Sequence, residues 1–356
     1  MTGSSLAASV EQALRDIPET LIGAEARHQI VTVANHLPGR MHAPLFGFEC
    51  ALATADAAAD LLVSAAGRPQ GPRALREAAA ALVSEFPDSS WGSVQRLADR
   101  WRNDGGLDHF WLEFDVEGPA PLLPNLFFGP GEGDAPPARG EELLALVHEL
   151  GPELTGEPLD DAMTEGFTRL MDVLPEQACV FQLGAMRARP GRGIRVCINE
   201  IYFDGIPRLL AALDHPAIHE VDRICRQLQP VADACALQLD LSPQLSPDVG
   251  IEVYVAPGRP ADDRRSREQG FVDWLATERL CTRAKADALM AYSGLSDVLS
   301  APEAWPPDLV AAGSLIGRRS GFLRRIHHFK LSAGPRPPRA KAYLAVQHVW
   351  LPARAD

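Results

Sequence analysis

Apolar and polar residues alternate along ten short segments of the chain, and the segments come in five close pairs. Such alternation is typical of β-strands with one buried face, because successive side chains of a strand point to opposite sides. The predicted pairs are residues 44–53 with 59–67, 110–118 with 124–130, 179–189 with 193–199, 235–243 with 250–257, and 325–333 with 339–350. The short connection within each pair predicts an antiparallel hairpin.

Amphipathic stretches separate one hairpin from the next, with apolar residues at the spacing of an α-helix. They lie at residues 74–86, 94–101, 142–150, 163–174, 206–213, 218–234 and 270–292. Residues 5–35 are a further predicted helical segment, with an apolar stripe that runs from Leu14 to Ile22. The Gly- and Pro-rich breaks between these elements are interpreted as loops within one unit.

A hairpin flanked by helices cannot bury its apolar face alone, so five such units must share one core. Ten antiparallel strands covered by helices predict an α+β fold, a ten-stranded antiparallel β-barrel of five repeated αββα units with the helices outside. We expect a helical segment over residues 1–40, packed on a single barrel domain over residues 41–356.

The composition changes this picture little, since 46% hydrophobic and 23% charged residues are ordinary for a globular protein. The net charge of -13 disfavours nucleic-acid partners, because surfaces that bind phosphate backbones carry excess positive charge. Six cysteines without metal-ligand spacing indicate reduced core thiols. No leader-like segment opens the chain and no run reaches the about 18 apolar residues of a membrane span, so a cytoplasmic protein is expected.

Strand parity predicts which side chains enter the barrel. Helices outside make the outward face apolar, so polar residues at alternate positions must face the lumen. The inward residues predicted in this way are Glu49, Glu113, Asp115, Asn125, Arg195, Cys197, Asn199, Gln238, Asp240, Glu252, Tyr254, His328, Lys330, Ser332, Lys341, Tyr343 and Gln347. Neither phase of residues 179–189 is cleanly apolar, which leaves Arg187 and Arg189 without a predicted direction.

Arg195, Lys330 and Lys341 come from the third and fifth predicted hairpins and would share the lumen with Tyr254 and Tyr343. Charge-assisted hydrogen bonds are strong in a poorly hydrated cavity, so this set is suited to a diphosphate. The alternative is a structural network in which the same cations pair with the inward carboxylates.

Glu49 and Glu113 lie on the first two hairpins, away from that basic sector. An apolar setting, with Trp111 and Phe127 nearby, would raise the pKa of a carboxyl group and suit it to general-base work. The alternative for each glutamate is an edge or salt-bridge residue.

The other motifs of the sequence give weaker support for a functional site. Asp160, Asp161 and Glu165 have a spacing that suits Mg²⁺ and diphosphate, but acidic residues also favour the first turn of a helix for electrostatic reasons. His327 and His328 are adjacent in a predicted strand, so they are expected to face opposite sides and not to share a metal. The sequence has no phosphate-binding P-loop and no GxSxG or HExxH motif.

Several of these segments resemble the ABBA-type, or PT-barrel, aromatic and peptide prenyltransferases, and the likeness of pattern covers most of the chain. FGFECALA presents Glu49 where that family has a glutamate on its first barrel strand. Arg195-Val196-Cys197 and Lys341-Ala342-Tyr343 are similar to its diphosphate-binding strands, and AMRAR adds Arg187 as a further basic residue. IEVY offers an acid where the family has a base.

The resemblance implies transfer of an allylic prenyl group from its diphosphate to an aromatic small molecule or a peptide side chain. It implies that Glu49 contacts the acceptor, and the residue pattern adds Glu113 as a second candidate. The resemblance implies Arg187, Arg195, Lys341 and Tyr343 as diphosphate ligands, to which strand parity adds Lys330 and Tyr254. The lumen lining expected from the residue pattern is Trp111, Phe127, Gln238, Glu252 and His328. With four tyrosines in the whole chain, Trp111, Phe127 and Phe128 would supply the aromatic faces that shield a carbocation.

No cofactor is expected to be required, and Mg²⁺ stays an open alternative. The expected partners are a prenyl diphosphate and an aromatic or peptide acceptor, with no nucleic acid and no membrane span. Two rival functions are kept. One is an isoprenyl diphosphate cyclase or synthase in the same barrel, and the other is a non-catalytic barrel that binds a peptide or lipid-like ligand.

Overall fold

The structure, a computed structural model, describes residues 6–37, 45–65, 70–86, 91–103, 107–116, 123–130, 138–189, 193–242 and 244–353. Its strands are β1 (Leu45–Ala51), β2 (Ala59–Ser64), β3 (Leu107–Phe114), β4 (Asn125–Pro130), β5 (Cys179–Ala185), β6 (Ile194–Asn199), β7 (Ala234–Ser242), β8 (Gln244–Tyr254), β9 (Gly294–Asp297), β10 (Arg318–Ala333) and β11 (Arg339–Pro352). Its helices are α1 (Leu6–Arg15), α2 (Ala24–His36), α3 (Gln70–Glu85), α4 (Trp91–Asn103), α5 (Gly140–Thr155), α6 (Asp161–Val173), α7 (Gly205–Ala212), α8 (Ile218–Leu228), α9 (Ala261–Thr277), α10 (Arg283–Tyr292) and α11 (Pro307–Ile316).

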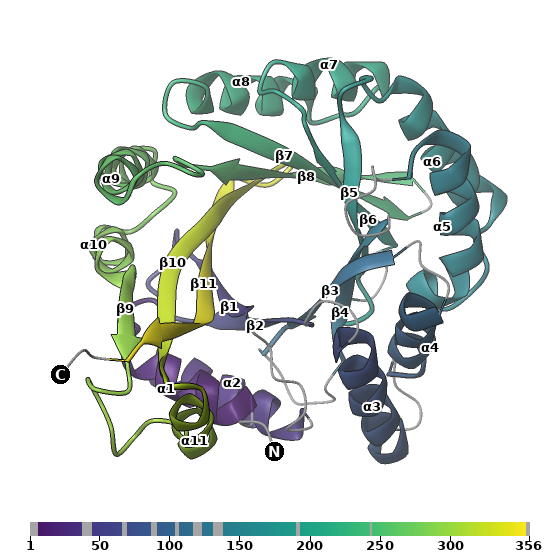
Figure 1. Cartoon of the computed structure of the whole chain (residues 1–356). Helices are drawn as coiled ribbons and strands as arrows, with labels where there is room; N and C mark the ends of the chain where they lie inside the picture. The colour runs from purple at the N-terminus through teal and green to yellow at the C-terminus, as the bar shows by residue number, and fades with distance from the viewer. Residues whose placement is uncertain are drawn as a thin grey trace.

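Ten of the strands form a closed antiparallel barrel. Each strand from β1 to β7 pairs with the next, β8 pairs with β10, β10 with β11, and β11 with β1. The short strand β9 pairs with β10 outside this ring. The helices surround the ring of strands, as Figure 1 shows. In the chain order, two helices separate most successive hairpins. The predicted α+β barrel with outer helices is therefore confirmed.

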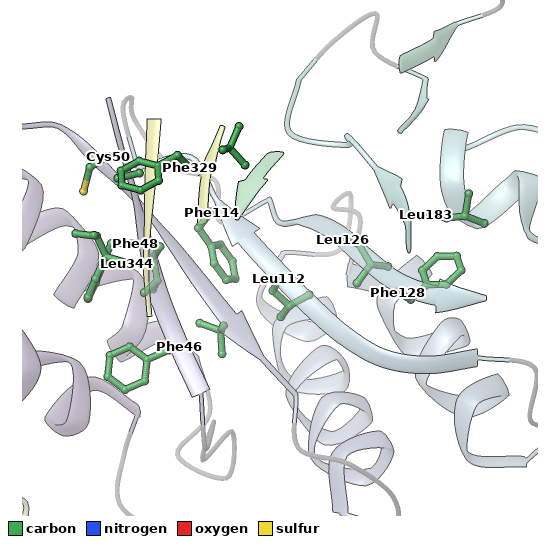
Figure 2. Packing of buried hydrophobic residues seen from close by; sticks show 14 of the residues in the cluster. Phe46, Phe48, Cys50, Leu112, Phe114, Leu126, Phe128, Leu183, Phe329 and Leu344 are labelled. Carbon is green, nitrogen blue, oxygen red and sulfur yellow. The ribbon is translucent and has the colours of Figure 1, made fainter. Parts of the chain in front are cut away.

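The hydrophobic core lies between the strands and the helices. On β1 the side chains of Phe46, Phe48 and Cys50 are fully buried, and Figure 2 shows them with outward apolar residues of neighbouring strands. Phe110 packs at 4.7 Å from Trp101 of α4 and at 5.6 Å from Phe128 of β4, measured between ring centroids. Because this layer takes the apolar residues of each strand, the alternate residues point into the barrel.

The predicted helical segment over residues 5–35 is two helices, α1 and α2, broken near Pro18. A proline disfavours helical backbone at the residue before it, which explains the break. The Arg27 guanidinium donates to the carbonyl oxygens of Leu14, Ile17 and Ile22 and so holds the connection closed. The buried apolar residues of both helices belong to the main hydrophobic core, and α2 packs on β2.

Two elements, β9 and α11, were not predicted from the sequence, and both lie between the last predicted helix and β10. All six cysteines are buried and free, as expected of reduced core thiols. Among the described helices, none has an apolar stretch long enough to cross a bilayer.

Candidate functional site

Two chambers share the lumen of the barrel. A mainly apolar chamber of about 210 Å³ takes in Trp111 and Phe127, and a charged chamber of about 500 Å³ takes in Glu49 and Lys330. Arg195 lines both chambers. A small-molecule site typically combines an apolar wall with a few polar groups, and these two chambers together offer that combination.

The charged chamber is rich in cations. The described residues that line it are Glu49, Ala51, Ala58, Ala59, Asp60, Asp115, Arg189, Arg195, Lys330, Ser332, Arg336, Arg339 and Lys341. Six of these side chains are basic and three are acidic. Carboxylates pair with four of the six cations and offset much of this charge. The positive charge that remains favours an anionic ligand.

Glu49 of β1 is held by two side chains from β11. Glu49 pairs in register with Tyr343, and its two carboxylate oxygens accept hydrogen bonds from the Lys341 ammonium and the Tyr343 hydroxyl. Burial raises the pKa of the Glu49 carboxyl, but the charges of Lys341 and Lys330 and these hydrogen bonds outweigh it. The pKa of Glu49 therefore lies well below its usual range, and the group is a carboxylate that is a poor proton acceptor.

Three more carboxyl groups lie near Glu49: Asp60 on β2, Glu113 on β3 and Asp115 just after β3. Arg189 donates to Glu113 at 2.5 Å and, through Nε, to Asp115 at 2.7 Å. Asp60 differs from them, since within the described ranges it accepts from the backbone N–H of Val116 and forms no ion pair. Burial and the charge of Glu49 raise the pKa of Asp60 to about 8, and they also raise the pKa of Glu113.

Arg195 is engaged in a buried pair. It is 6% exposed, and its Nε and Nη2 donate to the two oxygens of Asp240 at 2.7 Å and 3.0 Å. Arg195 of β6 lies opposite Asp240 of β7 in register. For Arg195 the geometry is therefore that of a structural ion pair, one of the two predicted alternatives.

Lys330 differs from the other lumen cations. Its side chain is 8% exposed, and its neighbours in register are Glu252 of β8 and Lys341 of β11. Glu252 is bonded instead to Gln238 and Tyr254, so no described carboxylate forms an ion pair with the Lys330 ammonium. Burial and the charge of Arg195 lower its pKa to about 8. Lys330 is a buried cation that forms no ion pair within the described ranges, although the charges of Glu49 and Glu113 act on it. This arrangement favours binding of an anion there.

Gly184 leaves room for one aromatic wall of the apolar chamber. A Cβ atom on Gly184 would lie 2.6 Å from the Phe127 ring, so the absence of a side chain gives that ring its place over β5. Trp111 and Phe127 are opposite one another in register on β3 and β4. The described lining residues of this chamber are Phe46, Gly47, Phe48, Leu62, His109, Trp111, Glu113, Phe127, Phe181, Gln182, Arg195, Gln238, Glu252, Tyr254, His327, His328, Tyr343, Leu344 and Ala345.

The expectation that His327 and His328 face opposite sides is wrong. A β-bulge in β10 shifts the register between Ile326 and His328, so two residues on β10 oppose one on β11. The Nδ1 atoms of the two histidines lie 2.7 Å apart, and both rings line the apolar chamber. Alternation along a strand holds only while the ladder is regular.

Two sequence-predicted residues lie outside the lumen. The Arg187 side chain packs against Gly156 at the end of α5 and lines neither chamber in the described structure. Residues 186–189 form a turn after β5, so the strand alternation no longer applies there. Phe128 points outward into the helix layer, against Phe110.

The remaining predicted site residues meet in the lumen. They are Glu49, Glu113, Arg195, Lys330, Lys341, Tyr254, Tyr343, Trp111, Phe127, Gln238, Glu252 and His328. The sequence interpretation missed the lumen residues Asp60, His327, Arg336 and Arg339, and it had left the direction of Arg189 open. For Asp60 a signal existed, because the outward apolar residues Leu61 and Val63 leave it inside.

The acidic motif near residue 160 has a structural role. Asp160 is the N-cap of α6, and its side chain accepts from the backbone N–H of Met163 at 2.7 Å, which stabilises the helix terminus. Within the described ranges, no group of three or more His, Cys, Asp or Glu side chains could hold a metal ion.

Comparison of the sequence with the profiles of known protein families gives no match, and comparison with curated proteins gives none either.

Proposed function

We propose that the barrel transfers an allylic prenyl group from its diphosphate to an aromatic small molecule or a peptide side chain, as a member of the ABBA-type prenyltransferases. The observation that carries the proposal is Lys330, a buried ammonium that forms no ion pair in the described structure. It lies in the charged chamber, and Arg195 joins that chamber to the apolar one. A ligand with a polyanionic head and an apolar tail fits this succession of environments.

In this proposal the charged chamber binds the diphosphate. Lys330 and Lys341 are neighbours in register on β10 and β11, so both ammonium groups reach the same ligand. Arg336 and Arg339 extend the basic lining of that chamber. These cations stabilise the charge that builds up on the departing diphosphate, which lowers the barrier to breaking the C–O bond.

The apolar chamber then holds the prenyl group. Trp111, Phe127 and Tyr254 line it, and an aromatic face stabilises a nearby cation electrostatically. The same walls keep water away from the allylic cation, which water would otherwise capture as an alcohol. Glu49 acts as a fixed carboxylate that orients Lys341 and Tyr343, because its own proton affinity is low.

A binding and product assay on the full chain tests the proposal. The wild type is titrated with dimethylallyl, geranyl and farnesyl S-thiolodiphosphates, which bind without reacting. It is then incubated with the three reactive diphosphates and a set of phenols, indoles and aromatic peptides. We expect saturable binding of at least one analogue and a prenylated product.

The matched variants are Lys330→Met in the lumen and Arg187→Ala outside it. K330M should weaken binding of the analogue about tenfold or more, while R187A should leave it unchanged within twofold. No saturable binding, or no prenylated product from any pair of substrates, would contradict the proposal. A prenyl alcohol or hydrocarbon formed without an acceptor would favour the cyclase function instead.

A further inference from the structure

The bulge in β10 gives the apolar chamber two histidine rings on one side. His328 is opposite Tyr343 in register, and His327 is the inserted residue. The His328 ring stacks on the Tyr343 ring at 4.1 Å with an interplanar angle of 19°. It also lies 5.3 Å from the Tyr254 ring. Tyrosine rings on two neighbouring strands therefore fix the orientation of His328.

His328 ends in a buried nitrogen without a partner. The side chain is 8% exposed, and its Nε2 atom has no hydrogen-bond partner in the described structure. Its other nitrogen, Nδ1, is bonded to Nδ1 of His327, the more accessible of the two rings. An unpaired polar atom in such a place loses its hydration without compensation, which favours a ligand group that bonds to it.

The polar groups around the pair do not satisfy that atom. The Glu252 carboxylate accepts from Gln238 Nε2 and, at 2.5 Å, from the Tyr254 hydroxyl. The Oε1 atom of Gln238 is itself buried, and no described group bonds to it. Two unpartnered atoms, His328 Nε2 and Gln238 Oε1, thus belong to residues that line the same chamber.

Charged groups from four strands set the protonation state of the pair. The titratable groups that face it are Glu49, Glu252, Tyr254, Arg325, Lys330 and Tyr343. Burial lowers the pKa of His328 to about 4, although Glu252 acts in the opposite direction. Burial also lowers the pKa of His327. Both rings are therefore neutral near pH 7 and able to accept a proton.

We propose that the His327–His328 pair is the proton acceptor of the transfer reaction, an inference that rests on the proposed function. Nδ1–H of His328 donates to Nδ1 of His327, which leaves a lone pair on Nε2 of His328 facing the acceptor substrate. The C–O bond of the prenyl diphosphate breaks with its electron pair on the diphosphate. An electron pair of the acceptor forms the new bond to the prenyl carbon, and the proton that the acceptor loses moves to His328 Nε2.

A weak base is sufficient for this step, because bond formation to the prenyl cation makes the proton of the acceptor strongly acidic. Glu49 is less suited to it, since its carboxylate is already occupied by Lys341 and Tyr343. His328 is the catalytic residue in this assignment, and His327 is a positioning residue that fixes the tautomer through the Nδ1 contact.

The test compares wild type with His328→Phe, which keeps a flat ring on Tyr343 and removes both nitrogens. General-base catalysis contributes on the order of 100-fold or more. We therefore expect H328F to bind the unreactive prenyl thiolodiphosphate within threefold of wild type and to lose about 100-fold in kcat. The decrease of kcat at low pH, which is the acidic limb of its pH profile, should disappear in this variant. His327→Asn should reduce kcat less and shift that limb.

Nitrogen-15 NMR of the histidine rings in the free protein gives a second readout. We expect a neutral His328 at pH 7 with the proton on Nδ1. Transfer by H328F within threefold of wild type with an unchanged pH profile, or a proton on Nε2 in the NMR spectrum, would overturn the inference alone. A wild type that transfers no prenyl group would overturn the proposed function and the inference with it.

Discussion

Glu49 and Lys341 form an ion pair between β1 and β11, the two strands at which the first and last hairpins of the barrel meet. Glu49 is 3% exposed, and the Lys341 side chain reaches it from the position opposite Ala51, two residues along the strand. The pair raises the pKa of Lys341 and lowers that of Glu49. If the charged chamber binds a diphosphate as proposed, Lys341 has two competing partners, Glu49 and that ligand.

Opposite changes in diphosphate affinity are expected when the two partners are altered. Lys341→Met removes a charged hydrogen-bond donor worth roughly 1.5–3 kcal/mol, so inorganic pyrophosphate should bind about tenfold or more weakly. Glu49→Gln removes a negative charge beside the ligand and frees Lys341, so pyrophosphate should bind more tightly. Calorimetric titration of the two variants and wild type measures both effects. If both variants bind pyrophosphate as wild type does, Lys341 serves the structure alone.

Proton uptake should accompany ligand binding in mildly alkaline solution. Lys330 has a pKa of about 8 in the free protein, and a bound diphosphate favours its charged form and raises that pKa. At pH 8.5 a prenyl thiolodiphosphate should therefore bind with uptake of protons, and the affinity should fall as the pH rises further. Titrations in buffers with different ionisation enthalpies count the protons. Equal uptake by wild type and K330M would exclude Lys330 as the group concerned.

The position of Phe127 should depend on the missing side chain of Gly184. Gly184→Ala would bring a Cβ atom within 2.6 Å of the Phe127 ring and 3.1 Å of the Arg195 Cβ. The ring must move into the apolar chamber, at a cost of about 1–3 kcal/mol in the free energy of unfolding. Binding of a prenyl thiolodiphosphate should weaken, while that of inorganic pyrophosphate should not.

Gly270→Ala is the matched control for that variant. Gly270 lies inside α9, and a Cβ atom added there would meet no other atom within 4 Å. This substitution should leave both ligands unaffected and stabilise the helix by about 0.5–1 kcal/mol. Retention of prenyl-ligand affinity in G184A would show that the chamber does not hold the prenyl group.

Acid should destabilise the wild type partly through His328. The pKa of this ring is about 4 in the folded protein and 6.5 in its ordinary state, so the unfolded chain binds a proton more readily between these values. Its contribution to stability is present above pH 6.5 and is lost as the pH falls toward 4. Between pH 7 and pH 5 this loss amounts to about 2 kcal/mol.

Urea unfolding at the two pH values measures that difference, and H328F provides the comparison. The variant should lose less free energy of unfolding than wild type over this interval, by about 2 kcal/mol. His219→Asn, on the solvent side of α8, should lose as much as wild type. A drop of equal size in H328F and wild type would mean that His328 is not a buried neutral ring.

The sequence predicted the barrel and most of its lumen because the side chains of each strand still alternate between the two faces when the sheet closes into a barrel. Glu49, Glu252, Lys330 and Lys341 lie where parity placed them, since each strand buries its apolar face under helices. The ion pairs between lumen side chains could not be predicted from the sequence. Arg195 pairs with Asp240, whereas Lys330 forms no ion pair among the described residues. These outcomes depend on which strands become neighbours and on the reach of each side chain.

The failures have local causes. The bulge at His327 adds one residue to β10 without any marker in the sequence, and the turn after β5 separates Arg189 from Arg187 although both have the same parity. Both cases are breaks in regular backbone, where alternation loses its meaning. Two polar features of the lumen lie at these breaks, namely the histidine pair and the Arg189 guanidinium that binds Glu113.

A crystal structure of the full chain with dimethylallyl S-thiolodiphosphate tests the proposed ligand site most directly. We predict the diphosphate within hydrogen-bond distance of Lys330 and Lys341, with the prenyl group against Phe127 and Trp111. Ligand density outside the barrel, or a lumen without ligand at a saturating concentration, would contradict this prediction.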